Sequence, residues 1–341
     1  MERLLTAALL VAVLSPSVSA EEPPRTVRFV TLNVLHGGPL SGWSGNDQHL
    51  DARLDLVSDA LLTLRPDVVA LQEASWSRGR GEVASRLAGR LGMNHVYAPA
   101  SARLFDTGWI NRTAAAFMNF TEGPSILSRF AIARWEAHRL PRCGRRFEPR
   151  VLLFTELDTP EGRLPVFSTH TAGDPCHTQA VATLVRERRA DLPGVLMGDL
   201  NAVESSAAIA ALTGEAGFVD AFRVAHPDAP GFTVWQPVTA PDRRAFRRVD
   251  YVLIAPGRIF PGVVMGSRVV VDTPGRLPDG TALWPSDHYG VLADLVVFPP
   301  TGTGVADQEH AGRDRGDTSH SPYSPTAEGS SAKRQEPTGR R

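Results

Sequence analysis

Short runs of apolar and β-branched residues, each followed by turn residues, recur between Arg25 and Phe298. Each run is four to six residues long, which is the length of a strand buried in a protein core. The runs cover residues 27–32, 68–71, 166–169, 194–197, 249–254 and 290–295. We therefore predict core strands in these six places.

Two segments between these runs have helical periodicity. From Leu50 to Leu64 the apolar residues recur every three or four positions and fall on one face of a helix. Pro66 is expected to end this helix, because proline has no amide donor and disfavours helical geometry in the residue before it. A second helix is expected in residues 178–189. Strands mixed with helices predict a layered α/β architecture, and 341 residues suffice for one large domain or two small ones.

The two ends of the chain differ from the region between them. Residues 1–20 contain Arg3, an apolar run over residues 4–14 and small residues up to Ala20, the pattern of a secretory signal peptide. This run is too short to span a membrane, and no later stretch is long and apolar enough. Residues 299–341 have no Leu, Ile or Phe and are predicted to be disordered. We expect a folded domain within residues 21–298, secreted to the periplasm or the cell exterior after cleavage near Ala20.

The net charge and the cysteine content exclude few classes of function. The formal net charge is -1 at pH 7, so no global positive field favours nucleic acid or an anionic membrane as a partner. A local basic groove is compatible with this balance. Cys143 and Cys176 are the only two cysteines, and an isolated pair in an exported protein predicts a disulfide. His177 is expected to lie solvated at a helix start.

Polar residues follow or begin the predicted strands, where side chains from distant parts of the sequence can converge. They are Asn33, Glu73, His170, Asp199, Asn201, Asp250, Asp287 and His288. Each alone is more typical of a cap, a turn or an ion pair. Together they offer oxygen ligands for a hard cation, a base for water and donors for phosphate oxygens, which is what phosphodiester hydrolysis needs.

The same positions carry a family resemblance. Thr-Leu-Asn33, Leu-Gln-Glu73, Ser-Thr-His170, Gly-Asp199-Leu-Asn201, Arg-Val-Asp250-Tyr and Ser-Asp287-His288 stand in the order found in the endonuclease/exonuclease/phosphatase superfamily. Residues 123–129, Gly-Pro-Ser-Ile-Leu-Ser-Arg, also resemble a strand of that family. The resemblance implies a four-layer αββα sandwich of two packed mixed β-sheets flanked by helices.

The resemblance also implies roles. Glu73 is similar to the direct Mg²⁺ ligand, with Asn33 beside it and Asp287 as a further carboxylate on the metal side; Mn²⁺ is a possible substitute. Asp250 and His288 resemble a dyad in which the carboxylate orients the ring, and His170 and Asn201 resemble donors to phosphate oxygens. Asp199 resembles the residue that orients or deprotonates water, which leaves open whether Asp199 or His288 is the base.

These implications predict a secreted Mg²⁺-dependent phosphodiesterase of the nuclease type. A phospholipid phosphodiesterase of the sphingomyelinase type is the alternative, for which residues 108–120 are the best candidate for a lipid-contacting loop. The expected partner is thus a nucleic acid or a phospholipid headgroup, and no obligate protein partner is indicated. An inactive binding module on the same fold is the rival from another class, and it is disfavoured because every expected position is filled.

Overall fold

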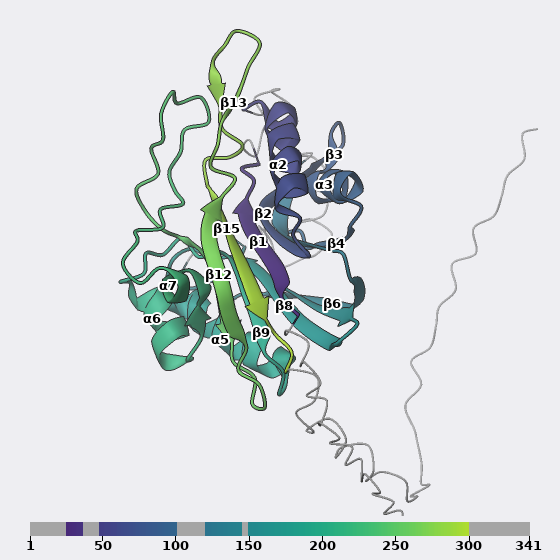
Figure 1. The fold of residues 1–341 in the computed structure, drawn as a ribbon, viewed down its shortest axis with the longest axis vertical. Helices are drawn as coiled ribbons and strands as arrows, with labels where there is room; N and C mark the ends of the chain where they lie inside the picture. Colours follow the sequence, from purple (N-terminus) through teal and green to yellow (C-terminus); the bar gives the residue numbers. More distant parts are fainter. Residues whose placement is uncertain (1–24, 37–47, 101–119, 145–148, 300–341) are drawn as a thin grey trace, which may run out of the picture. The chain divides into compact units, whose positions relative to one another are not determined.

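The computed structural model describes residues 25–36, 48–100, 120–144 and 149–299. These residues form two large β-sheets with helices beside them (Figure 1). The predicted signal peptide and all of the predicted disordered tail except Pro299 lie outside the described residues.

The first sheet has seven strands and is mixed. Its strands run in the order β12-β15-β1-β2-β5-β4, with β3 paired to β2. Strands β1 and β2 are parallel, whereas the other pairs are antiparallel. The strands are β1 (Val27–Asn33), β2 (Val68–Ser77), β3 (Gly81–Glu82), β4 (Asn94–Tyr97), β5 (Thr121–Ser128), β12 (Val263–Val270) and β15 (Gly290–Val296).

The second sheet has six strands in the order β10-β11-β9-β8-β7-β6 and is also mixed. Strands β8 and β9 are parallel, and their neighbours are antiparallel. The strands are β6 (Ala131–Arg139), β7 (Val151–Thr159), β8 (Gly162–His170), β9 (Gly194–Asp199), β10 (Val219–Asp220) and β11 (Asp250–Ala255). A separate small hairpin joins β13 (Gly275–Arg276) to β14 (Ala282–Leu283).

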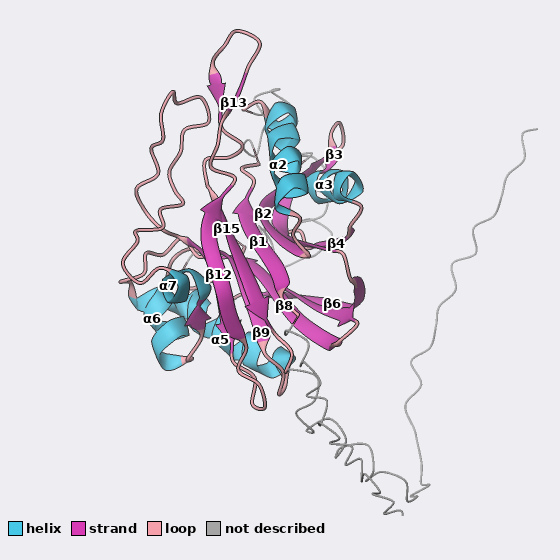
Figure 2. Cartoon of the chain, viewed as in Figure 1, coloured by secondary structure: helices cyan, strands magenta, loops and turns pink. Residues whose placement is uncertain are grey.

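Three apolar cores hold the layers together. One lies between the sheets and includes Phe29 of the first sheet and Met197 of the second. A second joins the first sheet to α2 (Leu50–Leu64) and α3 (Val83–Leu91), and a third joins the second sheet to α5 (Pro175–Arg189) and α6 (Ala207–Ala210). A five-residue π-helix, Ala211–Glu215, follows α6, and α7 is Ala221–Ala225. The predicted four-layer αββα sandwich is confirmed (Figure 2).

The hydrophobic pattern predicted most of the central strands, but it missed β7, of which seven of nine residues are buried. The six predicted strands are present as β1, β2, β8, β9, β11 and β15, with Val249 directly before β11, and both predicted helices are present. The resemblance also located β5, which contains residues 123–128 of the predicted strand. Strand β6 was not predicted, because this edge strand is largely exposed and carries charged residues. Within the described residues, no helix is long and apolar enough to cross a membrane.

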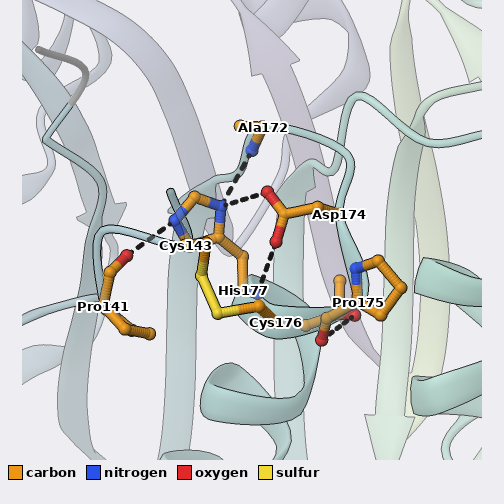
Figure 3. Close-up of a disulfide and its surroundings, with 8 residues drawn as sticks. Pro141, Cys143, Ala172, Asp174, Pro175, Cys176 and His177 are labelled. Carbon is orange, nitrogen blue, oxygen red and sulfur yellow. Dashed lines mark hydrogen bonds and ion pairs between the residues drawn. A yellow bond between two sulfur atoms is a disulfide. The ribbon is translucent and has the colours of Figure 1, made fainter. Parts of the chain in front are cut away.

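The predicted disulfide between Cys143 and Cys176 is present, with 5.8 Å between the Cα atoms (Figure 3). It joins the segment after β6 to the start of α5. The prediction for His177 is wrong: its side chain is 1% exposed. Its Nε2 lies 2.9 Å from the Pro141 carbonyl oxygen, and its Nδ1 lies 3.0 Å from Asp174 Oδ2. The segment that contains Pro141 and Cys143, which is bonded to Cys176, therefore covers the His177 ring. The spacing of apolar residues along the sequence gives no information about this long-range contact.

We predict that replacing both cysteines with serine lowers the free energy of unfolding by about 3–4 kcal/mol. The bridge spans 33 residues, and cross-linking a loop of this length removes conformational entropy from the unfolded chain. Urea denaturation of the oxidised wild type and of the double variant measures the difference. Equal midpoints and slopes would show that the bridge does not stabilise the fold.

Candidate functional site

The predicted site residues meet at one end of both sheets. In the second sheet, Asp199 is in register with His170 on β8 and with Asp250 on β11. In the first sheet, Asn33 at the end of β1 is in register with Gln72, the neighbour of Glu73 on β2. Because the two sheets pack face to face, these strand ends bring carboxylates and histidines from both sheets into one region.

A β-bulge positions Glu73. Between Leu71 and Ala74 the pairing of β2 with β5 shifts by one residue, and Glu73 has a φ of 54°. A non-glycine residue rarely adopts this left-handed conformation, which costs of the order of 1–3 kcal/mol. A bulge changes the direction in which a side chain points. The strained backbone at Glu73 therefore turns its carboxylate in a different direction from that of a side chain on a regular strand.

Asn33 connects the two sheets. Its Nδ2 donates to Glu73 Oε1 at 3.0 Å and to Asp199 Oδ2 at 3.1 Å. Its Oδ1 accepts the Leu35 amide at 3.0 Å, which fixes the orientation of the carboxamide. The side chain is fully buried. The geometry thus gives Asn33 the position of an orienting residue between two carboxylates, with its nitrogen directed at Glu73.

Asp199 is the most enclosed carboxylate of the group, with a side chain 1% exposed. Its Oδ1 accepts the Asn201 amide at 2.8 Å, and its Oδ2 lies 3.4 Å from His170 Nε2. Burial raises the pKa of Asp199 to about 7; the charge of Asp250 acts in the same direction, whereas His288 and the bonds from Asn201 and Asn33 oppose it. An Asp199 carboxyl with this pKa exchanges its proton near neutral pH.

His170 is close to Asn201. The Asn201 Nδ2 lies 2.8 Å from His170 Nε2 and donates to the Thr171 carbonyl at 3.0 Å. Burial, together with the positive charges of Arg150, His288 and His36, lowers the pKa of His170 well below its usual value. His170 is consequently a neutral hydrogen-bonding group.

Asp250 and His288 form the predicted pair. His288 Nδ1 lies 2.9 Å from Asp250 Oδ2, and His288 Nε2 points toward Asp199 Oδ2 at 3.7 Å. Burial disfavours the imidazolium, but the charges of Asp250 and Asp199 outweigh burial and raise the pKa of His288 to about 10. His288 is therefore a cation at neutral pH, held between two carboxylates.

A buried arginine fixes the loops that carry these groups. Arg53 of α2 is fully buried and donates to the carbonyls of Val34, Leu35 and Pro285 at 2.8, 2.8 and 3.2 Å. Its Nε donates to the Gln48 carbonyl at 2.8 Å. These bonds connect the loop after β1 to the loop that carries Asp287 and His288. Ser286 adds a second link by donating to the Asn33 carbonyl at 2.6 Å.

Three further residues at the site were not predicted. His36 Nε2 lies 3.3 Å from Glu73 Oε2 and 2.9 Å from Glu122 Oε2. Arg150 lines a shallow pocket with Glu73, Glu122 and His170. Burial disfavours the charged forms of both His36 and Glu122, but their mutual hydrogen bond and the nearby opposite charges outweigh it. The pKa of His36 is therefore raised and the pKa of Glu122 is lowered. The signals were present in the sequence: His36 follows Asn33 by three positions, and Glu122 directly precedes residues 123–129.

The residues present fit a divalent cation. Glu73 and Glu122 converge with His36, with their ligand atoms within 4.8 Å of one another. Burial raises the pKa of Asp287 against the opposing charge of His288, and the negative charge of Glu73 acts in the same direction as burial, so Glu73 and Asp287 repel one another without a cation. Carboxylate oxygens suit Mg²⁺ or Mn²⁺. A second group, Asp199, Asp250 and His288, also lies within 4.8 Å, although His288 Nδ1 is already bonded to Asp250.

Two packed mixed sheets with flanking helices, with carboxylates and histidines gathered at the strand ends, define the class of α/β-sandwich hydrolases that act on phosphate esters. The endonuclease/exonuclease/phosphatase family model matches residues 30–288, and the chain belongs to this family. Members of the family hydrolyse phosphoester bonds. No curated protein sequence matches the chain.

Solved structures with the same fold are distant in sequence. An endonuclease/exonuclease/phosphatase family protein from Bacteroides thetaiotaomicron has a TM-score of 0.61 and 16% identity, over 81% of this chain and 99% of that one. A mannosyl-6-phosphatase from the same organism has a TM-score of 0.59 and 18% identity, over 79% and 99%. The catalytic domain of human nocturnin with bound sulfate has a TM-score of 0.57 and 17% identity, over 80% and 93%.

We predict that His288→Ala and Asp250→Ala each lower kcat by about 10²–10³, the range for losing one group that stabilises charge at the reacting centre. The double variant should lose little more than either single variant, because residues that act as a unit are non-additive. His95→Ala is the control, since His95 pairs with Glu82 at 3.1 Å on β4, an edge strand. Circular dichroism and thermal melts must first show that each variant folds. Near-wild-type turnover in folded His288→Ala contradicts the role, and losses that multiply contradict the pairing.

We also predict that Arg53→Met lowers the free energy of unfolding by about 3–5 kcal/mol, because it leaves buried carbonyl groups without their donor. Arg86→Met is the control. Arg86 forms a surface pair with Asp51 at 2.7 Å, and such a pair contributes about 0–1 kcal/mol. Urea denaturation measures both changes, and amide hydrogen exchange should report faster opening at residues 34–35 and 286–288. A loss no greater than that of the control would contradict the positioning role.

Proposed function

We propose that this chain is a secreted, divalent-metal-dependent phosphodiesterase of the nuclease type. The observation that carries the proposal is the arrangement of two groups in one site. The Asp250–His288 pair faces Asp199, and the Glu73 carboxylate lies on the other side of the Asn33 carboxamide.

Glu73 and Asp287 are the proposed metal-holding carboxylates, with Glu122 and His36 beside Glu73. Bound there, Mg²⁺ or Mn²⁺ supplies positive charge that offsets the charge of the phosphate ester. The chain's own groups do the rest in the proposed reaction. The Asn201 carboxamide orients the neutral His170 ring at Nε2, and His170 donates from its other ring nitrogen to the non-bridging oxygens. Buried His288 contributes a fixed positive charge near the reacting phosphate.

Asp199 is the proposed base, a choice that the sequence left open. A general base must be free of its proton near the operating pH. The pKa of Asp199 is about 7, whereas the pKa of His288 is about 10 because of Asp250 and Asp199. Asp199 can therefore accept the proton of the attacking water, while His288 remains protonated.

Secretion is part of the proposal. It is supported by the signal-peptide pattern of residues 1–20 and by the disulfide between Cys143 and Cys176, since disulfides form and persist in oxidising compartments. The loop considered for lipid contact, residues 108–120, lies outside the described residues except for Phe120, which is buried against the His36 ring.

One activity panel tests the proposal. The mature protein with Mg²⁺ is incubated with single-stranded DNA, plasmid DNA, RNA, sphingomyelin, phosphatidylinositol and mannose 6-phosphate. The proposal predicts hydrolysis of one or more nucleic acids with the highest kcat/KM. Preference for the phospholipids would instead support the sphingomyelinase-type alternative, and preference for mannose 6-phosphate would make the chain a phosphomonoesterase. Binding without turnover of any of these would support the inactive module.

We predict that excess EDTA abolishes activity and that Mg²⁺ or Mn²⁺ restores it, because the proposed ligands are mainly carboxylate oxygens. Glu73→Gln should raise the metal concentration needed for half-maximal activity by about tenfold or more, since it removes one ligand charge. Glu187→Gln is the control, because Glu187 is 54% exposed and lies on α5. Undiminished turnover in excess EDTA would remove the metal from the mechanism.

A further inference from the structure

Exposed aromatic rings gather in the connection between α7 and β11. Phe232, Trp235 and Phe246 have exposed fractions of 42%, 56% and 57%. Figure 1 shows this connection as the long green loops above α7. We call these three residues the aromatic rim. Large rings left this exposed are unusual for side chains whose role is core packing.

The backbone beside Trp235 pairs directly with residues of the site. Val234 forms β-bridges with both His288 and Arg247. The Gln236 amide donates to the Asp287 carbonyl at 2.8 Å, so Trp235 lies between two positions that pair with site residues. The Phe246 amide donates to the Val234 carbonyl at 2.8 Å. The backbone on both sides of Trp235 is thus paired with site residues, and Phe246 is bonded to the same segment.

Exposed arginines lie on either side of Phe246 in the sequence. Arg243, Arg244 and Arg247 are all exposed, and the Arg247 guanidinium lies 5.2 Å from the centre of the Phe246 ring. Arg243 is held by Asp272 at 2.8 Å and covers the Tyr289 ring, whereas Arg247 is closer to the rim. Positive side chains among exposed rings complement a chain of phosphates that carries flat bases.

Within the described residues, one group of exposed aliphatic side chains lies far from the site. Ile259, Val263 and Met265 are 60%, 44% and 58% exposed, and they follow the end of β11 that is remote from Asp250. Six strand residues separate that end from the site, a length of about 20 Å. Insertion of these side chains into a lipid surface would hold the site away from the headgroups. The exposed rings on the connection that pairs with the site, with Arg247 over one of them, favour nucleic acid over lipid.

We propose that the aromatic rim, with Arg247, binds the bases of a single-stranded nucleic acid whose scissile phosphate lies at His170, Asp199 and His288. This inference rests on the proposed function and names the substrate as single-stranded. Stacking on aromatic rings tolerates any base, so the rim predicts binding with little sequence preference. A duplex keeps its bases stacked on one another and cannot offer them to the rim without unpairing.

Binding in excess EDTA tests the rim apart from catalysis. The probe is a fluorescein-labelled ten-nucleotide oligothymidylate, and its anisotropy is measured against mature protein. Trp235→Ala should raise Kd by about tenfold, the size of one lost base–ring stack, and Trp235→Phe should recover most of the affinity. Trp135→Ala is the matched control, since Trp135 is 51% exposed but lies on the edge strand β6. Arg247→Gln should reduce the slope of log Kd against log salt concentration by about 0.7, one phosphate contact.

Kinetics give the second readout. With Mg²⁺, Trp235→Ala should raise KM for the oligonucleotide about tenfold and leave kcat within about twofold, as expected for lost uniform binding. Unchanged Kd and KM in Trp235→Ala overturn the inference, even if the wild type hydrolyses nucleic acids as proposed. If Trp235→Ala loses binding to anionic phosphatidylserine vesicles but keeps its affinity for the oligonucleotide, the inference is also overturned, and the rim is assigned to lipid. If the wild type hydrolyses no diester, the proposed function fails, while binding in EDTA still decides whether the rim holds a single strand.

Discussion

The buried carboxylate of Asp199 is the constraint on which the rest of the site depends. Removing a carboxylate from water is costly unless donors and positive charges surround it. Asn33 supplies a donor from the first sheet, Asn201 supplies a backbone amide, and His288 supplies a positive charge. The requirements of this one carboxyl group thus account for the positions of three residues whose chain positions differ by up to 255.

The backbone within each sheet is adapted to this arrangement. A side chain at Gly198 would lie 2.1 Å from the Thr169 carbonyl oxygen, so only glycine fits directly before Asp199. On the opposite sheet, the bulge at Glu73 carries strain that a regular strand avoids. Arg53 then holds the loop after β1 and the loop before β15 beside the two sheets, through hydrogen bonds to the Val34 and Pro285 carbonyls.

The sequence predicted the parts of the fold whose pattern is local. Buried strands such as β9 and the amphipathic helix α2 were predicted because each carries its own hydrophobic signature. The site motifs were predicted because they resemble those of a family. The pairing of His36 with Glu122 was not predicted, since it joins residues 86 positions apart and has no periodic signature. The burial of His177 and the exposure of Trp235 likewise depend on how loops fold over or away from the sheets, which residue patterns do not encode.

The central claim is that Asp199 acts as the base while His288 keeps its proton, and the pH dependence of kcat/KM between pH 4 and 11 tests it most directly. Activity should rise as Asp199 loses its proton, with a midpoint at pH 7 or below because a bound cation favours the carboxylate. Activity should fall at high pH as His288 loses its proton. Folded Asp199→Asn should have low activity and no rising limb. A rising limb that persists in Asp199→Asn, or one that disappears in His288→Asn instead, would contradict the account.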